Sequence, residues 1–408
     1  MKLRSALFAA AAMFASCGNE AVTTDSDSSL QDSKEIVGGF DAKAKALDAV
    51  GTIGVMDGDT YAFTCSATLI TPDTVLTAKH CAMVTDSQSP LFGMKLVNLE
   101  QVFFAIGSDA SRPAKIVEVI AADLSPVEQG GANGIGSDMA LLHLIEPITD
   151  VAPIKIADAQ FVASDVNKGF AMVGFGTKNN YDYFTGQGSP TRATGKATLR
   201  ALQGKDYQLM FGTWEAFFRA MASYYGLDIA TQYEAVIRGW YDNTVLLKDY
   251  EAYTGHVTGD AQLCHGDTGG PLIGREAGEK KIFGVASAMF FSSQLVCDYG
   301  AFYATFGPET RGFIEKGVRY SDPCAGGITV AGRCDRDVAI RCSDKWEGDR
   351  SRSELDCSLL DQECVIGANG RAGCGDVDET PVHPAAPTAA EIRASIANAA
   401  HKMVELKK

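Results

Sequence analysis

The sequence lacks several features that define whole classes of protein. None of its apolar runs approaches the 18 or so residues that a membrane-spanning helix needs. Its 13 prolines beside 42 glycines exclude a collagen-like or broadly disordered chain. Lys and Arg number only 36 against 51 Asp and Glu, a net charge of −15, which disfavours nucleic acid as a partner because phosphate binding needs a basic face. No repeat of solenoid period is visible. What remains is a globular protein of 408 residues, long enough for two or three domains.

Residues 1–17 are typical of a targeting segment. Lys2 and Arg4 form a charged start, and a short apolar stretch follows. The end of this segment, Phe14-Ala15-Ser16-Cys17, resembles the cleavage box of bacterial lipoproteins, in which the cysteine is lipidated. The alternative is ordinary signal cleavage that leaves Cys17 as a free thiol. Both predict export to a compartment where disulfides persist, as an outer-membrane or cell-surface lipoprotein in the first case, attached to the membrane only through a lipid on Cys17.

Residues 18–35 are rich in Ser, Asp and Thr and predict a flexible linker or propeptide. From 36 to 322 the pattern is mostly short β-type runs between Gly, Asp and Asn turns, which favours an all-β barrel or sandwich. The clearest runs are Ala62–Leu69, Val102–Ile106, Met139–Leu144, Met172–Phe175 and Ile282–Ala288.

One stretch of this domain is helical in pattern. Trp214, Phe217, Phe218, Met221 and Tyr225 recur at helical spacing. Thr213 is the candidate N-cap and Gly226 the stop. A second helical pattern runs from Ile229 to Arg238. We expect this helical segment to pack as core or as a lid.

Residues 323–376 hold six of the eleven cysteines. Such density predicts a small disulfide module, and 15 pairings are open. Zinc is the rival interpretation, but the segment has no Cys-x-x-Cys pair and no histidine. Residues 377–408 predict a Pro/Ala linker and a terminal amphipathic helix that begins at the capping box Thr388 to Glu391 and serves as a docking or solvated tail.

Three motifs carry candidate chemistry. Hydrolysis of an amide by a side-chain nucleophile needs a hydroxyl, a base, a carboxylate that orients the base, and donors for the oxyanion. The chain offers Thr77-Ala-Lys-His80-Cys81, then Ser137-Asp138-Met-Ala-Leu-Leu, then Gly266-Asp267-Thr268-Gly-Gly-Pro. Ahead of them stands Ile36-Val-Gly-Gly.

In this order, the motifs resemble the trypsin/chymotrypsin family of serine proteases over residues 36–322. The resemblance implies a double β-barrel with a helical insertion, in which His80 is the general base, Asp138 its orienter and Thr268 the nucleophile. The family has Ser at the last position. Threonine keeps the hydroxyl but adds a methyl group that restricts the rotamer and crowds the turn, which predicts a slower enzyme rather than a dead one.

The resemblance also assigns supporting roles. Gly266 and Thr268 supply oxyanion N–H groups, and Ser287 supports Asp138. Cleavage before Ile36, by an activating protease, frees an ammonium group that pairs with Asp267. The implied disulfides are Cys65–Cys81 and Cys264–Cys297. Gly174-Phe-Gly176 imitates the start of a dinucleotide-binding loop, but the following residues do not fit one.

The specificity pocket departs from the trypsin pattern. Gln262 stands where trypsin-like enzymes place a carboxylate for Lys or Arg substrates, and Ala288 and Met289 stand where Trp and Gly are common. Asp260 reaches the pocket only if its loop shifts. We therefore expect cleavage after small or medium uncharged residues.

The sequence thus predicts an exported endopeptidase that acts on protein or peptide substrates without a metal or other cofactor. One alternative is a non-catalytic binding protein on the same scaffold, in which the Thr268 methyl group disables the chemistry. A third class is a surface protein that only displays the Cys-rich module. The complete set of supporting residues around Thr268 favours the enzyme.

Overall fold

A computed structural model describes two compact units of the chain. The described residues are 40–41, 45–57, 60–83, 102–177, 191–291, 297–320, 322, 324, 328–342, 352–360, 362–367 and 369–375. The first unit ends at Tyr320, and the second contains the described residues from 322 to 375. The targeting segment predicted over 1–17, the linker over 18–35 and the tail over 377–408 lie outside the described residues. No described helix is long and apolar enough to cross a membrane.

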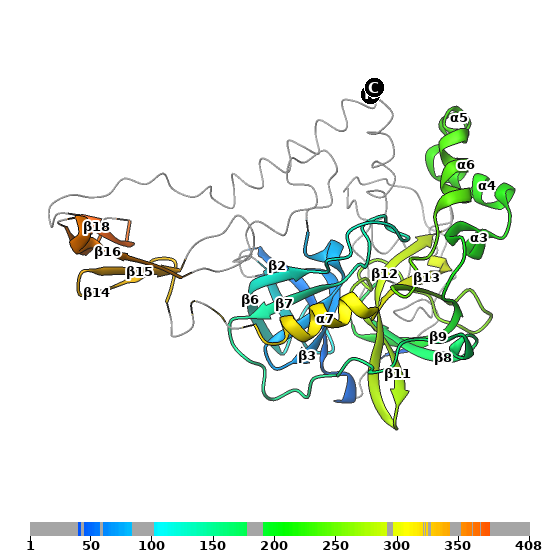
Figure 1. The fold of residues 1–408 in the computed structure, drawn as a ribbon. Coiled ribbons are helices and arrows are strands. Elements are labelled where there is room, and N and C mark those ends of the chain that lie inside the picture. Colours follow the sequence, from blue (N-terminus) through cyan, green and yellow to red (C-terminus); the bar gives the residue numbers. More distant parts are fainter. Residues whose placement is uncertain are drawn as a thin grey trace. The chain divides into compact units, whose positions relative to one another are not determined.

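Six antiparallel strands of the first unit close into a barrel (Figure 1). They are β2 (Val50–Asp57), β3 (Thr60–Thr71), β4 (Thr74–Thr77), β5 (Val102–Ile106), β6 (Lys115–Leu124) and β7 (Ala140–Leu144). Their order is β2-β3-β4-β7-β6-β5, and β2 pairs with β5 to close the barrel. Every residue of β7 is buried, and all of them are apolar except His143.

A second barrel follows in the same unit. Its strands are β8 (Gly169–Gly174), β9 (Ala193–Ala201), β10 (Glu251–Thr254), β11 (Pro271–Glu276), β12 (Glu279–Phe291) and β13 (Cys297–Thr305). The order is β9-β10-β13-β12-β11-β8, the β8–β9 pair closes it, and β1 (Phe40–Asp41) joins the outer side of β9. The predicted all-β fold with two barrels is confirmed.

Four helices are inserted between β9 and β10 (Figure 1). They are α3 (Asp206–Phe211), α4 (Trp214–Tyr225), α5 (Leu227–Gln232) and α6 (Glu234–Asn243). The prediction for α4 is confirmed, since the Thr213 hydroxyl accepts a hydrogen bond from Ala216 N at 3.2 Å and the helix ends at Gly226. Buried side chains of α4, α5 and α6 form a small core of their own, made of Phe217, Met221, Ala230, Ile237 and Tyr241.

The other helices differ in part from the sequence-based expectation. The helical pattern from Ile229 to Arg238 is confirmed, but the chain breaks at Tyr233 into two helices, α5 and α6. The sequence pattern also missed α3 and α7 (Pro308–Gly317), which follows β13. Helix α3 is only six residues long and α7 has few apolar residues, so neither shows a sustained helical period. Only Met210 in α3 and Ile314 in α7 are buried large apolar side chains.

The second unit is a small disulfide-rich fold. It contains a three-stranded sheet of β14 (Arg333–Asp335), β15 (Val338–Cys342) and β16 (Arg352–Asp356). A two-stranded sheet of β17 (Glu363–Ile366) and β18 (Ala372–Gly375) follows. Its six cysteines pair as Cys324–Cys342, Cys334–Cys364 and Cys357–Cys374. This pairing is one of the 15 connectivities that the sequence leaves open.

Candidate active site

Strand register brings His80 and Asp138 together. Thr77 at the end of β4 pairs with Ala140 at the start of β7. Because the strands are antiparallel, the residues after Thr77 meet the residues before Ala140. His80 lies there in a short 3-10 helix (Lys79–Cys81), and its Nδ1 is 2.8 Å from Asp138 Oδ2. The backbone N–H of His80 also donates to Asp138 Oδ1 at 3.0 Å. The carboxylate therefore binds both the ring and the backbone of His80.

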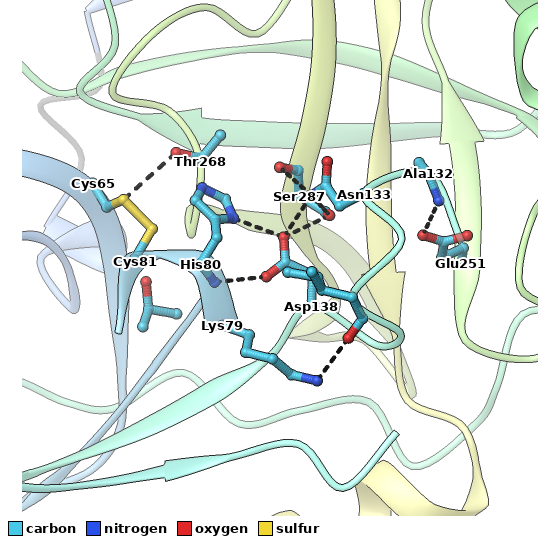
Figure 2. Close-up of polar contacts among 12 residues, drawn as sticks. Cys65, Lys79, His80, Cys81, Ala132, Asn133, Asp138, Glu251, Thr268 and Ser287 are labelled. Atoms are coloured by element: carbon cyan, nitrogen blue, oxygen red, sulfur yellow. Dashed lines mark hydrogen bonds and ion pairs between the residues drawn. A yellow bond between two sulfur atoms is a disulfide. The ribbon is translucent and has the colours of Figure 1, made fainter. Parts of the chain in front are cut away.

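Asp138 is 1% exposed and receives two further hydrogen bonds (Figure 2). The Ser287 hydroxyl of β12 donates to Oδ2 at 2.7 Å. The amide nitrogen of Asn133 donates to the same oxygen at 3.0 Å. A buried carboxylate is stable only when its oxygens are satisfied in this way.

The same contacts set the protonation of the pair. Burial alone raises the pKa of Asp138, but the charge and hydrogen bonds of His80, with the Ser287 hydroxyl, hold that pKa below its usual value. Burial alone lowers the pKa of His80, and the charge and hydrogen bond of Asp138 outweigh it and raise that pKa. The arrangement therefore yields a histidine that takes up a proton readily and a carboxylate that stays ionised beside it.

Thr268 lies in the turn before β11, next to the disulfide that anchors His80. Figure 2 shows its hydroxyl turned toward Cys65, and Oγ1 is 3.6 Å from Cys65 Sγ. The disulfide joins Cys65 to Cys81, and both sulfurs lie within 4.8 Å of a His80 ring nitrogen. Among the residues that the structure describes, no hydrogen bond joins the Thr268 hydroxyl to His80. The two side chains are thus neighbours, with the hydroxyl rotated toward sulfur.

The turn 264–270 presents two backbone donors. Within the described ranges, the N–H groups of Gly266 and Thr268 donate to no protein acceptor. Gly266 has φ +93°, and its carbonyl accepts a hydrogen bond from the Ser66 hydroxyl at 2.7 Å, which fixes the turn against β3. Two N–H groups that have no protein acceptor and lie beside a hydroxyl can hold a developing oxyanion.

The side chain of Asp267 holds this turn in place through hydrogen bonds to backbone N–H groups. Its carboxylate is fully buried and accepts Gly176 N at 2.7 Å and Cys264 N at 2.9 Å. A Cβ on Gly174 would lie 2.2 Å from Asp267 Oδ1, and one on Gly176 would lie 2.4 Å from its Cγ. The two glycines of the Gly-Phe-Gly run therefore make room for Asp267. Its predicted partner Ile36 lies outside the described residues.

The residues predicted to line a specificity pocket lie around the β12–β13 pair. The Gln262 side-chain carbonyl accepts Gly300 N at 2.9 Å, while Ala288 and Met289 of β12 pair with Phe302 and Ala301. The disulfide Cys264–Cys297 connects this region to the turn. Asp260 instead accepts hydrogen bonds from the backbone and hydroxyl of Thr198 on β9.

Sequence reasoning missed three polar residues next to the candidate site. Asn133 contacts the carboxylate directly, Lys79 donates to two carbonyls of the loop before Asp138, and Glu251 accepts an N–H from the same loop. The signal available was the glycine-rich run 130–136 just before Asp138.

Comparison with known proteins bears on the first unit. A family model described as Trypsin matches residues 36–194. A search of curated proteins found no match. The matched segment contains His80 and Asp138, whereas Thr268 follows it in the chain. The family match and the two closed six-stranded barrels together show that this chain has a trypsin/chymotrypsin-family fold.

Proposed function

We propose that residues 36–322 form an exported endopeptidase in which Thr268 is the nucleophile, His80 the general base and Asp138 its orienter. The observation that carries the proposal is the complete hydrogen-bonded pair His80–Asp138, supported by Ser287, beside the Thr268 hydroxyl. Five disulfides support an exported location, since such bonds persist outside the cytoplasm.

Catalysis would begin with rotation of the Thr268 side chain from Cys65 toward His80. The hydroxyl then attacks the carbonyl carbon of the scissile peptide while His80 takes its proton, and Asp138 stabilises the imidazolium. The N–H groups of Gly266 and Thr268 bind the oxyanion. His80 returns the proton to the leaving amine, and a water molecule hydrolyses the acyl-threonine ester by the same steps.

Activation would follow cleavage between Glu35 and Ile36. The freed ammonium of Ile36 would pair with the buried Asp267 carboxylate and so stabilise the turn that carries the oxyanion donors. Glu35 does not suit a pocket for small uncharged residues, so we infer that another protease makes this cut. In the uncut protein, lipidation of Cys17 would hold the chain at the membrane.

Covalent labelling tests the proposal. The chain beginning at Ile36 is treated with a fluorophosphonate probe as wild type, Thr268→Ser, Thr268→Val and His80→Ala. We expect labelling of the first two, stronger for serine, and none of the last two. Valine is nearly isosteric with threonine and lacks only the hydroxyl, so equal inertness of the wild type and the valine variant in folded protein would contradict catalysis.

A second function is favoured by one specific observation. The Thr268 hydroxyl contacts Cys65 Sγ rather than His80. A chain unable to leave this rotamer would be a non-catalytic binding scaffold at the cell surface. Strong labelling of Thr268→Ser together with an inert wild type would identify this case, because it shows an intact site blocked by one methyl group.

A further inference from the structure

The loop between β6 and β7 has an unusual backbone. Four of its glycines adopt positive φ values: Gly130, Gly131, Gly134 and Gly136. Gly136 N donates to Gly130 O at 2.9 Å, and Gly134 N donates to Gly131 O at 3.1 Å. These bonds close a compact turn that carries Asn133 into the protein, where the residue is only 6% exposed. The glycines are needed because other residues rarely adopt this backbone conformation.

Asn133 is directed at the triad carboxylate (Figure 2). Its Nδ2 donates to Asp138 Oδ2 at 3.0 Å, to Ser287 Oγ at 2.9 Å and to the Ser287 carbonyl at 3.3 Å. Its Oδ1 is buried and has no hydrogen-bond partner among the described residues. An apolar residue would fill this place without an unsatisfied oxygen, so the contribution of the amide lies in its donor side. The ionised acceptor fixes which end faces Asp138.

Two buried polar side chains, Lys79 of the first barrel and Glu251 of the second, hold the loop at two points. The Lys79 ammonium donates to Val127 O at 2.7 Å and to Ile135 O at 3.0 Å. Glu251 of β10 accepts Ala132 N at 2.9 Å and Leu247 N at 2.8 Å through its two oxygens. A Cβ on Gly131 would lie 2.4 Å from Glu251 Oε1, so the close approach requires glycine. Asn133 is therefore held by a loop attached to both barrels.

We propose that Asn133 is a positioning residue of the triad, whose amide fixes Asp138 and lowers the proton affinity of the His80–Asp138 pair. This proposal rests on the proposed function. The positive end of the N–H dipole points at the carboxylate, and its potential extends to the imidazole behind it. Removing the amide leaves the pair more negative, so His80 becomes a stronger base that is protonated at higher pH.

The test uses two readouts of Asn133→Ala in the chain that begins at Ile36. An NMR titration of the His80 ring is expected to show its midpoint moved to higher pH. Ester hydrolysis is expected to lose about 10- to 100-fold in kcat, the loss that corresponds to one hydrogen bond to a charged group, with KM little changed. The acid limb of kcat/KM should move with the NMR midpoint. Asn133→Ser, whose shorter side chain does not reach Asp138, serves the same measurements if the alanine variant does not fold.

Controls separate this role from a structural one. Asn243→Ala removes an exposed amide of α6 that donates to Gly239 O, and should leave the His80 midpoint in place. Among the described residues, Lys79 and Glu251 interact electrostatically with Asp138, and Glu128 interacts with Lys79; all three stay unchanged in these variants. A loss of kcat at every pH with an unmoved midpoint would overturn the proposal.

The outcome for Asn133 is distinguishable from that for the proposed function. The NMR titration needs no turnover, so an inert wild type whose His80 midpoint still moves in Asn133→Ala would sink the protease but keep the positioning role. An active wild type whose His80 midpoint does not move in Asn133→Ala would support the protease and overturn the positioning role of Asn133.

Discussion

The Thr268 hydroxyl and Cys65 Sγ lie 3.6 Å apart, so the candidate nucleophile contacts the disulfide that anchors its candidate base. Threonine has only three staggered positions for its hydroxyl, methyl and hydrogen. When the Thr268 hydroxyl rotates toward His80, the methyl group moves into a staggered position that holds only a hydrogen atom in serine.

We expect Thr268→Ser to raise the rate of peptide hydrolysis. Crowding of about 1–3 kcal/mol by the methyl group corresponds to about a 5- to 200-fold gain in kcat when it is removed. Steady-state kinetics on one peptide substrate measures this. A serine variant slower than the wild type would mean that the turn is adapted to threonine.

Removal of the Cys65–Cys81 disulfide should impair both stability and activity. The bond closes a 16-residue separation, and its loss is expected to lower the free energy of unfolding by about 3 kcal/mol. Because His80 adjoins Cys81, kcat should fall as well. The double variant Cys65→Ala/Cys81→Ala is compared with Cys357→Ala/Cys374→Ala, whose separation is 17 residues. Equal activity of the two double variants would contradict a role for the first disulfide in placing His80.

Substrate profiling should show cleavage after small or medium uncharged residues. Gln262 offers no negative charge, and a buried Lys or Arg without a partner is strongly unfavourable. Gln262→Asp is expected to add cleavage after Lys and Arg. The control is Gln160→Asp, which makes the same substitution, and so adds the same negative charge, in a loop where the amide donates to Phe306 O. A dominant Arg or Lys preference of the wild type would refute the pocket assignment.

We expect the buried carboxyl group of Asp206 to make the stability of the protein depend on pH. It is 1% exposed, neither carboxylate oxygen has a hydrogen-bond partner among the described residues, and burial raises its pKa to about 7. The folded state then holds the proton more tightly than the unfolded chain, so this group destabilises the fold as pH rises from about 4 to about 7. Asp206→Asn should stabilise the protein above pH 7 by about 2–4 kcal/mol and leave it unchanged near pH 4.

Denaturant unfolding at both pH values measures this difference. Asp228→Asn, a change at an exposed acid in the first turn of α5, is the matched control and should stabilise the protein at neither pH. A gain of Asp206→Asn that is equal at both pH values would argue against titration of this carboxyl group.

Activation and anchoring should form one switch. Residues 18–35 contain no cysteine, so no disulfide can hold the cut propeptide to the catalytic domain. If Cys17 is lipidated, chains cut before Ile36 should be soluble and uncut chains membrane-bound. Fractionation with N-terminal sequencing tests this. Active chains that begin at Ile36 and stay on membranes after a high-salt wash would contradict the coupling and direct attention to residues 377–408.

The sequence predicts the parts of this protein that depend on local pattern. The spacing of the apolar residues and the Thr213 cap predict helix α4, and both are confirmed. The break at Tyr233 was invisible because Ala230 and Ile237 pack into one core and keep the apolar spacing across it. Asn133 escaped notice because its contacts to Asp138 and Ser287 depend on how a glycine-rich loop folds back, which no periodicity encodes. The pairing of the module's cysteines likewise depends on tertiary contacts.

Ser66 of β3 in the first barrel donates through its backbone to Thr268 O at 2.9 Å and through its hydroxyl to Gly266 O, both in the second barrel's turn. The candidate site is therefore assembled from both barrels and exists only while they are docked. In mild denaturant, covalent labelling of Thr268 should disappear before the strand signal in circular dichroism. Loss of Thr268 labelling would then report an early step of unfolding, in which the two barrels separate while each is still folded.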